Sequence, residues 1–193
     1  ALSMAIDRQK IVDTVLGGFG ETAYVASNIT PDRPEFNEEW RVPYDVAGAK
    51  QKLIDAGYPE GFEITLWSAC NLPAIWDCEI ADAIGEMWIT NLGLDVTIDH
   101  ADYAVRRPES VDKTMNTPWL HGIGWLPGQS IANFYCAHPG HLGGVTLPDD
   151  ICAIGKQNDI EPDMDKRLGN NVAMTEYMSH WQTQSAVATV GNY

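Results

Sequence analysis

The stretch GFEITLWSACNLPAIWDCEIADAIGEMWITNLGLDVTIDH, residues 61–100, decides the fold. Apolar and polar side chains alternate in residues 62–67 and again in residues 94–99, which predicts two half-buried strands. Apolar residues at helical spacing between them predict a helix, with Asp77 as its cap and Gly93 just past its end. The pattern therefore predicts a βαβ unit with parallel strands. Ligands of such units gather at the carboxyl ends of the strands.

Composition and charge narrow the classes of function. The chain has 193 residues, with 12 basic and 27 acidic side chains and a net charge of −15. This charge argues against a nucleic-acid partner and against an anionic membrane surface. No apolar run reaches the roughly 20 residues of a membrane span. Ala1 begins what reads as the tail of a helix, so we expect a longer parent protein whose upstream part carries any export signal.

The remaining patterns predict a single α/β lobe over residues 1–193, with helices packed on a partly mixed sheet. Asp7 and Asp45 are expected to cap helices that run to about residues 16 and 57. A short helix is expected over residues 102–107, before Pro108. Further helices are expected over residues 151–157 and 162–181, and strands over residues 119–125 and 186–190.

The four cysteines form no CxxC pair, which argues against a zinc ribbon or a thioredoxin motif. Cys136 and Cys152 flank a loop rich in Gly and Pro and are the first candidate for a disulfide. Cys70 and Cys78 flank the loop of the central unit and are the second candidate. Free buried thiols remain the alternative for both pairs.

Other reactive groups lack the pattern that their chemistry needs. Cys136, His138 and His141 in CAHPGH offer three zinc ligands, but Pro139 and Gly140 predict a turn and no fourth ligand is near. A nucleophile elbow and a phosphate-binding glycine loop are both missing from the sequence. Arg106 and Arg107 could bind an anion, but a solvated pair on the surface is the preferred interpretation.

Tryptophans mark the ends of the predicted strands. Trp67 ends the first central strand on its polar side, Trp76 lies in the adjoining loop, and Trp125 ends another strand. Aromatic rings at such positions often line a cleft for a small ligand. The alternative is that they cover the rim of the core.

Several segments together resemble the peptide/nickel class of ABC-transporter solute-binding proteins. The resemblance is carried in chain order by ALSMAIDRQKIVDTVLGGFG at 1–20, YDVAGAKQKLIDAGYPEGFEITLW at 44–67, CEIADAIGEMWITNLGLDVTIDHADY at 78–103, HGIGW at 121–125 and DMDKRLGNNVAMTEYM at 163–178. AIDR and AGYPEGF are the most specific of these motifs. The match covers almost the whole chain.

The resemblance implies a fold of two α/β lobes around a hinged ligand cleft, of which this chain is the second lobe and the first is absent. Proteins of this class are not enzymes and use no cofactor. They deliver a peptide or other small ligand to membrane permeases, and work in the periplasm or as lipoproteins outside the cell. Some members carry a disulfide like Cys136–Cys152.

Two departures from the dipeptide-binding members bear on the ligand. The segment after the Gly-Trp pair has no carboxylate, and Asn71 stands where those members have an arginine. An ion-paired clamp suits a zwitterionic dipeptide, so we expect a sugar-like, opine-like or longer peptide ligand. The residues expected to line the cleft are Trp67, Ser68, Asn71, Trp76, Tyr103, Trp125, Gln129 and Asn133.

No catalytic residue and no metal ligand is assigned. A nickel or zinc receptor using His138 and His141 is one rival hypothesis, and a module that only docks a partner protein is another. A hydrolase would need a nucleophile beside a base. A lone lobe covers half a ligand, so we expect weak binding and self-association through the exposed cleft face.

Overall fold

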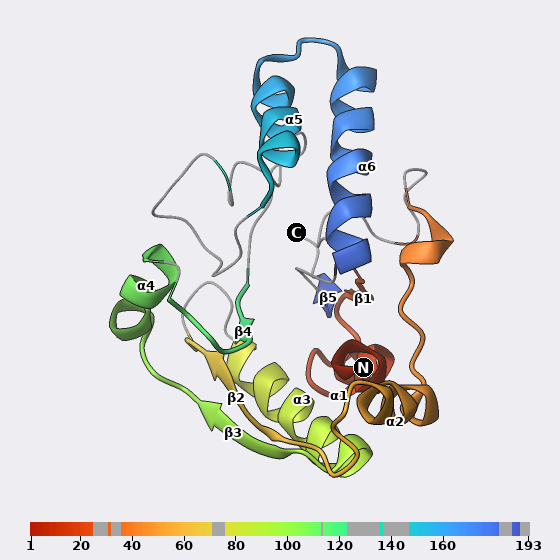
Figure 1. The fold of residues 1–193 in the computed structure, drawn as a ribbon, viewed down its shortest axis with the longest axis vertical. Coiled ribbons are helices and arrows are strands. Elements are labelled where there is room, and N and C mark those ends of the chain that lie inside the picture. Colours follow the sequence, from red (N-terminus) through yellow and green to blue (C-terminus); the bar gives the residue numbers. More distant parts are fainter. Residues whose placement is uncertain are drawn as a thin grey trace.

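The central stretch forms the predicted βαβ unit in the computed structural model (Figure 1). β2 (Glu63–Ser68) and β3 (Asp95–Asp99) pair in parallel, and α3 (Asp77–Leu92) connects them. Gly93 ends the helix in the left-handed conformation, at φ 73°. β4 (Trp119–Leu120) pairs in parallel with the other edge of β2, so the strand order is β3-β2-β4. The carboxyl ends of all three strands therefore lie at one edge of this sheet.

The structure describes residues 1–24, 31, 36–70, 76–112, 114–122, 136, 147–181 and 187–189. Its other elements are η1 (Leu2–Ala5), α1 (Arg8–Thr14), β1 (Glu21–Thr22), η2 (Glu38–Trp40), α2 (Val46–Asp55), α4 (Tyr103–Val111), α5 (Asp149–Ile160), α6 (Met164–Trp181) and β5 (Ala188–Thr189). β1 and β5 form an antiparallel pair apart from the parallel sheet. The α/β class is confirmed, although the described strands form two sheets rather than one mixed sheet. None of the described helices is both long and apolar enough to cross a membrane.

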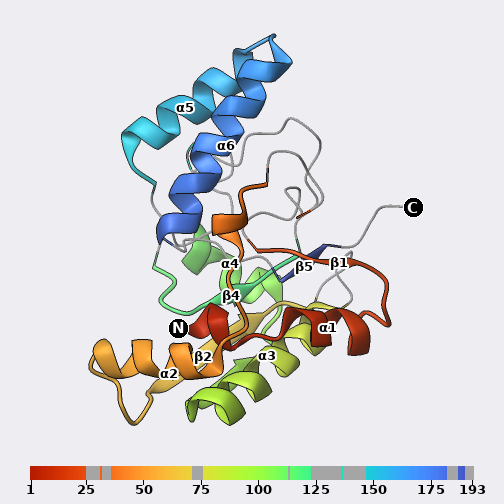
Figure 2. The same cartoon turned by 90° about the vertical axis from the view of Figure 1, so that its right-hand side faces the viewer.

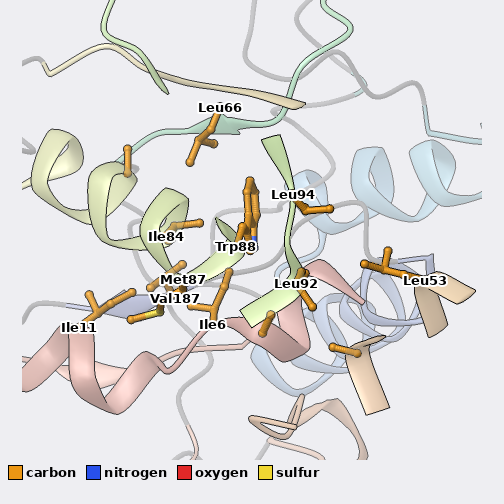
Figure 3. Close-up of a cluster of buried hydrophobic side chains, with 13 residues drawn as sticks. Ile6, Ile11, Leu53, Leu66, Ile84, Met87, Trp88, Leu92, Leu94 and Val187 are labelled. Carbon is orange, nitrogen blue, oxygen red and sulfur yellow. The ribbon is translucent and has the colours of Figure 1, made fainter. Parts of the chain in front are cut away.

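The main core lies between α3, the parallel sheet and the first helices. Figure 3 shows its buried side chains converging around Trp88. The indole Nε1 of Trp88 donates to the carbonyl oxygen of Leu2, 3.1 Å away, so the apolar face of α3 is also tied to the N-terminal segment. Ile84, Met87 and Leu92 are among the apolar residues whose helical spacing predicted this helix, and they are buried in the same core.

Three of the predicted helix starts are confirmed by their caps. The carboxylates of Asp7 and Asp45 accept from backbone N–H groups of the first turns of α1 and α2, at 3.0 and 2.9 Å. Asp102 caps α4 in the same way, at 2.8 Å. Each bond pairs an N–H group that the helix itself leaves free.

Two predictions about helix ends are wrong. Asp77 is the first residue of α3 rather than its cap, and its carboxylate accepts from the backbone N–H of Gly122 instead, at 2.9 Å. α4 continues through Pro108 to Val111. Proline has no N–H group, so the helix continues here with one backbone hydrogen bond fewer.

α5 and α6 form a helical hairpin that stands away from the parallel sheet (Figures 1 and 2). Leu147, Ile151 and Met174 build a second, smaller core between these helices. Cys136 and Cys152 form a disulfide beside this core, as predicted. Cys70 and Cys78 form the other, so the free-thiol alternative is wrong for both pairs.

Arg8, the last residue of the AIDR motif, is a buried charge that joins three segments. Its guanidinium donates to the backbone oxygens of Ala23 and Ser3, each at 3.0 Å, and to the Ser3 hydroxyl at 2.7 Å. It also lies 5.2 Å from the centre of the Tyr24 ring. Burial lowers the pKa of Arg8 to about 10, which still leaves the side chain charged at neutral pH.

Candidate functional site

Four rings gather at the carboxyl edge of the parallel sheet, and we call them the aromatic cluster: Trp67, Tyr103, Trp119 and His121. Trp67 of β2 and Trp119 of β4 are register partners, and their ring centres lie 4.4 Å apart with planes at 24°. His121 follows β4 and stacks on Trp119 at 4.6 Å. Tyr103 of α4 stacks on Trp67 at 6.5 Å and on His121 at 5.9 Å. The strand pairing thus creates the cluster, and α4 completes it.

Trp67 is the buried centre of the aromatic cluster. Its side chain is 0 % exposed, and its Nε1 donates to the carbonyl oxygen of Ala101 at 2.9 Å. The prediction that Trp67 lies on the polar side of a half-buried strand is therefore wrong, because Trp119 and Tyr103 cover that side. These two rings and His121 remain half-buried, so they form the exposed part of the cluster.

Arg106 supplies a charge behind the aromatic cluster. Its guanidinium carbon lies 5.7 Å from the centre of the Trp67 ring. Its terminal nitrogens form ion pairs with Asp99, at 3.1 Å, and with Glu109, at 3.3 Å. Arg106 is thus not part of a solvated surface pair, and its charge is matched within the lobe rather than left for an anionic ligand.

Burial shifts the pKa of two groups at this edge. It lowers the pKa of His121, which favours the neutral imidazole in the stack. Burial also raises the pKa of Asp77, while the hydrogen bond from Gly122 acts in the opposite direction. The aromatic cluster is therefore an uncharged surface near neutral pH.

Hydrogen-bonding capacity remains at the same edge. The Oγ of Ser68 and the Nε1 of Trp119 are buried and have no hydrogen-bond partner among the described residues. Buried polar atoms are rarely left unpaired. Water, a ligand or another segment of the protein is expected to satisfy them.

The structure brings together only part of the predicted site. Trp67, Ser68 and Tyr103 lie at the carboxyl edge, with Trp67 and Ser68 fully buried. Trp76 is half-buried and immediately precedes α3. The other predicted lining residues lie outside the described residues: Asn71, Trp125, Gln129 and Asn133.

Two members of the aromatic cluster were missing from the predicted site, namely Trp119 and His121. The signal for them was the alternation in WLHGIGW, since residues two apart on a strand share a face. His138 and His141, which the rival metal-receptor hypothesis would use, lie outside the described residues.

The family of the chain is established by comparison with known proteins. The model described as "Bacterial extracellular solute-binding proteins, family 5 Middle" matches residues 1–136 of the 193. The chain belongs to this family. Its members are binding proteins of ABC transporters rather than enzymes.

Individual proteins of known sequence or structure resemble the chain over different lengths. The glutathione-binding protein GsiB of Salmonella typhimurium is 39% identical over 72 residues, which are 37% of this chain and 14% of GsiB. The structure of NikA from Staphylococcus aureus in complex with Ni(L-His)2 matches with a TM-score of 0.76 at 18% identity. The murein tripeptide binding protein MppA of Escherichia coli matches at 0.72 and 23%. These matches cover 97% and 98% of this chain but only 40% and 38% of the two solved chains.

Proposed function

We propose that this chain forms one wall of the ligand cleft in a two-lobed solute-binding protein that feeds an ABC importer. Family membership supports the class of protein, and the span of about two fifths of NikA and MppA supports a single lobe. The observation that carries the proposal is the aromatic cluster at the carboxyl edge, where ligands of parallel α/β sheets bind.

The proposed contacts divide by exposure. Tyr103, Trp119 and His121 present half-buried rings and are the proposed contact surface. Trp67 and Ser68 are buried, so we propose that they support this contact surface from beneath. The other predicted lining residues, which are Asn71, Trp76, Trp125, Gln129 and Asn133, stay in the proposal as further parts of the wall.

The ligand that suits this wall is a small polar or peptide-like solute with little charge of its own. The cluster is uncharged near neutral pH, and the charge of Arg106 is matched by Asp99 and Glu109. Stacked rings bind the flat or apolar faces of a solute, and free polar groups orient it. A peptide, a sugar-like solute or an opine-like solute satisfies this description.

The proposed partners are the membrane subunits of the importer. The family is extracellular by its description, and we place the protein in the periplasm, or at the cell surface as a lipoprotein. An isolated lobe would leave its cleft face uncovered, and self-association through that face is part of the proposal.

A thermal-shift screen of the complete parent protein tests the function. Oligopeptides, oligosaccharides and opines are the panel. A ligand at about 100 times its dissociation constant adds roughly 2.7 kcal/mol of stability. We expect one class to raise the melting temperature and Tyr103→Ala to abolish the rise. Val105→Ala, an exposed position on the same helix, is the matched control and should keep it.

Two outcomes would contradict the proposal. If no class shifts a protein that is shown to be folded, the docking module becomes the better hypothesis. If a ligand shifts the wild type and Tyr103→Ala equally, a binding protein remains but the aromatic cluster is not its wall.

A further inference from the structure

A second group of reactive side chains lies beside the carboxyl ends of β2 and β3, and we call it the sulfur–imidazole cluster: Cys70, Cys78 and His100. Cys70 follows β2, Cys78 lies in the first turn of α3, and His100 follows β3. Nδ1 of His100 lies 3.3 Å from the sulfur of Cys70 and 3.1 Å from that of Cys78. Among the residues that the structure describes, this is the one group of three or more Cys, His, Asp or Glu side chains that could hold a metal ion.

Asp82 orients the imidazole of this cluster. It lies one helical turn after Cys78, and its Oδ1 is 3.0 Å from Nε2 of His100. A carboxylate only accepts, so Nε2 carries the hydrogen and the lone pair of the neutral ring is on Nδ1. That lone pair faces two disulfide sulfurs that carry no hydrogen to donate. A carboxylate behind one ring nitrogen is the usual support of a metal-binding histidine.

We propose that reduction of the Cys70–Cys78 disulfide opens a site in which both thiolates and Nδ1 of His100 bind one zinc-like divalent cation. Two sulfurs and one imidazole are zinc ligands, and a fourth position stays free for water or a solute. With zinc–ligand bonds of about 2.3 Å to sulfur and 2.0 Å to nitrogen, tetrahedral ligands lie about 3.5–3.8 Å apart. His100 is already close to this separation, and the sulfurs reach it once their bond is broken.

The chemistry balances with a thiol as the reductant. Two thiol molecules supply two electrons and two protons, which cleave the sulfur–sulfur bond and leave two cysteine thiols and one external disulfide. The cation then displaces one proton from each thiol, without a change in its own oxidation state. The position of Cys78 in the first turn of α3 favours the thiolate. Cys70 and His100 are exposed, so the reductant and the cation can both reach the cluster.

Cobalt titration tests the proposal, because thiolate ligands give Co²⁺ a charge-transfer absorption. The chain has four cysteines, so Cys136→Ser combined with Cys152→Ser leaves only the pair in question. This variant is reduced with a phosphine, which becomes its oxide, and is titrated with Co²⁺ without oxygen. We expect one equivalent to produce the absorption and Zn²⁺ to remove it. The same protein before reduction should produce none.

Single substitutions then separate a built site from two free thiols. Asp82→Asn should weaken Co²⁺ binding 10–100-fold because it releases the ring of His100, and His100→Gln should weaken it more. Glu86→Gln, an exposed carboxylate one turn further along α3, is the matched control and should leave the affinity unchanged. As a second readout, Zn²⁺ should protect Cys70 and Cys78 from alkylation.

Three results would overturn the proposal. The first is the absence of the absorption after reduction, in a protein whose circular dichroism is unchanged. The second is equal affinity in His100→Gln, which would show that the histidine is not a ligand. The third is equal binding by the oxidised protein, which would remove the role of the disulfide.

Discussion

Trp67→Phe tests whether the centre of the aromatic cluster is packed as described. The substitution removes the Nε1 donor and leaves the carbonyl oxygen of Ala101 unpaired, at a cost of about 1 kcal/mol. It also removes two ring carbons from a side chain that is fully buried, which costs about 1.6 kcal/mol at roughly 0.8 per carbon. We expect a loss of about 2.5 kcal/mol, or roughly 5–10 °C in melting temperature.

Urea unfolding followed by circular dichroism measures this change, and Trp76→Phe is the matched control. The same substitution at half-buried Trp76 should cost less than about 1 kcal/mol. Trp67→Phe should also reduce the coupling to Trp119, which a double-mutant cycle is expected to place at about 0.5–1.5 kcal/mol. If Trp67→Phe costs no more than Trp76→Phe, or if the cycle shows no coupling, the stacked centre of the proposed wall is refuted.

Three further predictions concern stability and are read from urea midpoints. Burial lowers the pKa of His121, so the folded protein binds a proton there less readily than the unfolded chain does. The contribution of His121 to stability should be complete above about pH 6.5 and should decrease as the pH falls toward the lowered pKa. His121→Gln should make this pH dependence shallower. Gly93→Ala should lower the free energy of unfolding by about 1–2 kcal/mol because Gly93 has a positive φ. Gly61→Ala should lower it further, because Gly61 also has a positive φ and its new Cβ would lie 2.8 Å from a backbone oxygen. Equal losses would contradict that contact. Replacing Cys136 and Cys152 by serine should lower the free energy of unfolding by about 3 kcal/mol, because the disulfide joins residues 16 positions apart. An unchanged urea midpoint would show that the disulfide does not contribute to stability.

Relations between near neighbours in the chain were predictable from the sequence. The strand periods of β2 and β3, the apolar face of α3 and the caps of α1 and α2 all depend on residues a few positions apart, and no distant segment displaces them in this fold. The AIDR motif, which ends in Arg8, indicated the family, but the sequence did not show what Arg8 does in the fold. In the structure, its buried guanidinium holds three segments together.

Predictions failed where a distant segment offered a better partner. The sequence predicts that Asp77 caps its own helix, but its carboxylate accepts a hydrogen bond from the N–H of Gly122, 45 residues away. The alternation of its strand predicts a polar face for Trp67, but β4 and α4 cover that face. Local periodicity does not state which strand will lie alongside, and so it cannot state which face will be covered.

The sequence by itself determined the α/β class, the order of the central elements and the kinship with solute-binding proteins, because periodicity and motifs are properties of neighbouring residues. Only the tertiary structure decided which side chains meet at the carboxyl edge of the parallel sheet. The parallel register places Trp67 against Trp119, and the β2–α3–β3 crossover brings His100 to the Cys70–Cys78 disulfide. Trp67 and Trp119 are 52 positions apart in the chain, and Cys78 and His100 are 22 positions apart, so the tertiary fold and not the local sequence brings these pairs into contact.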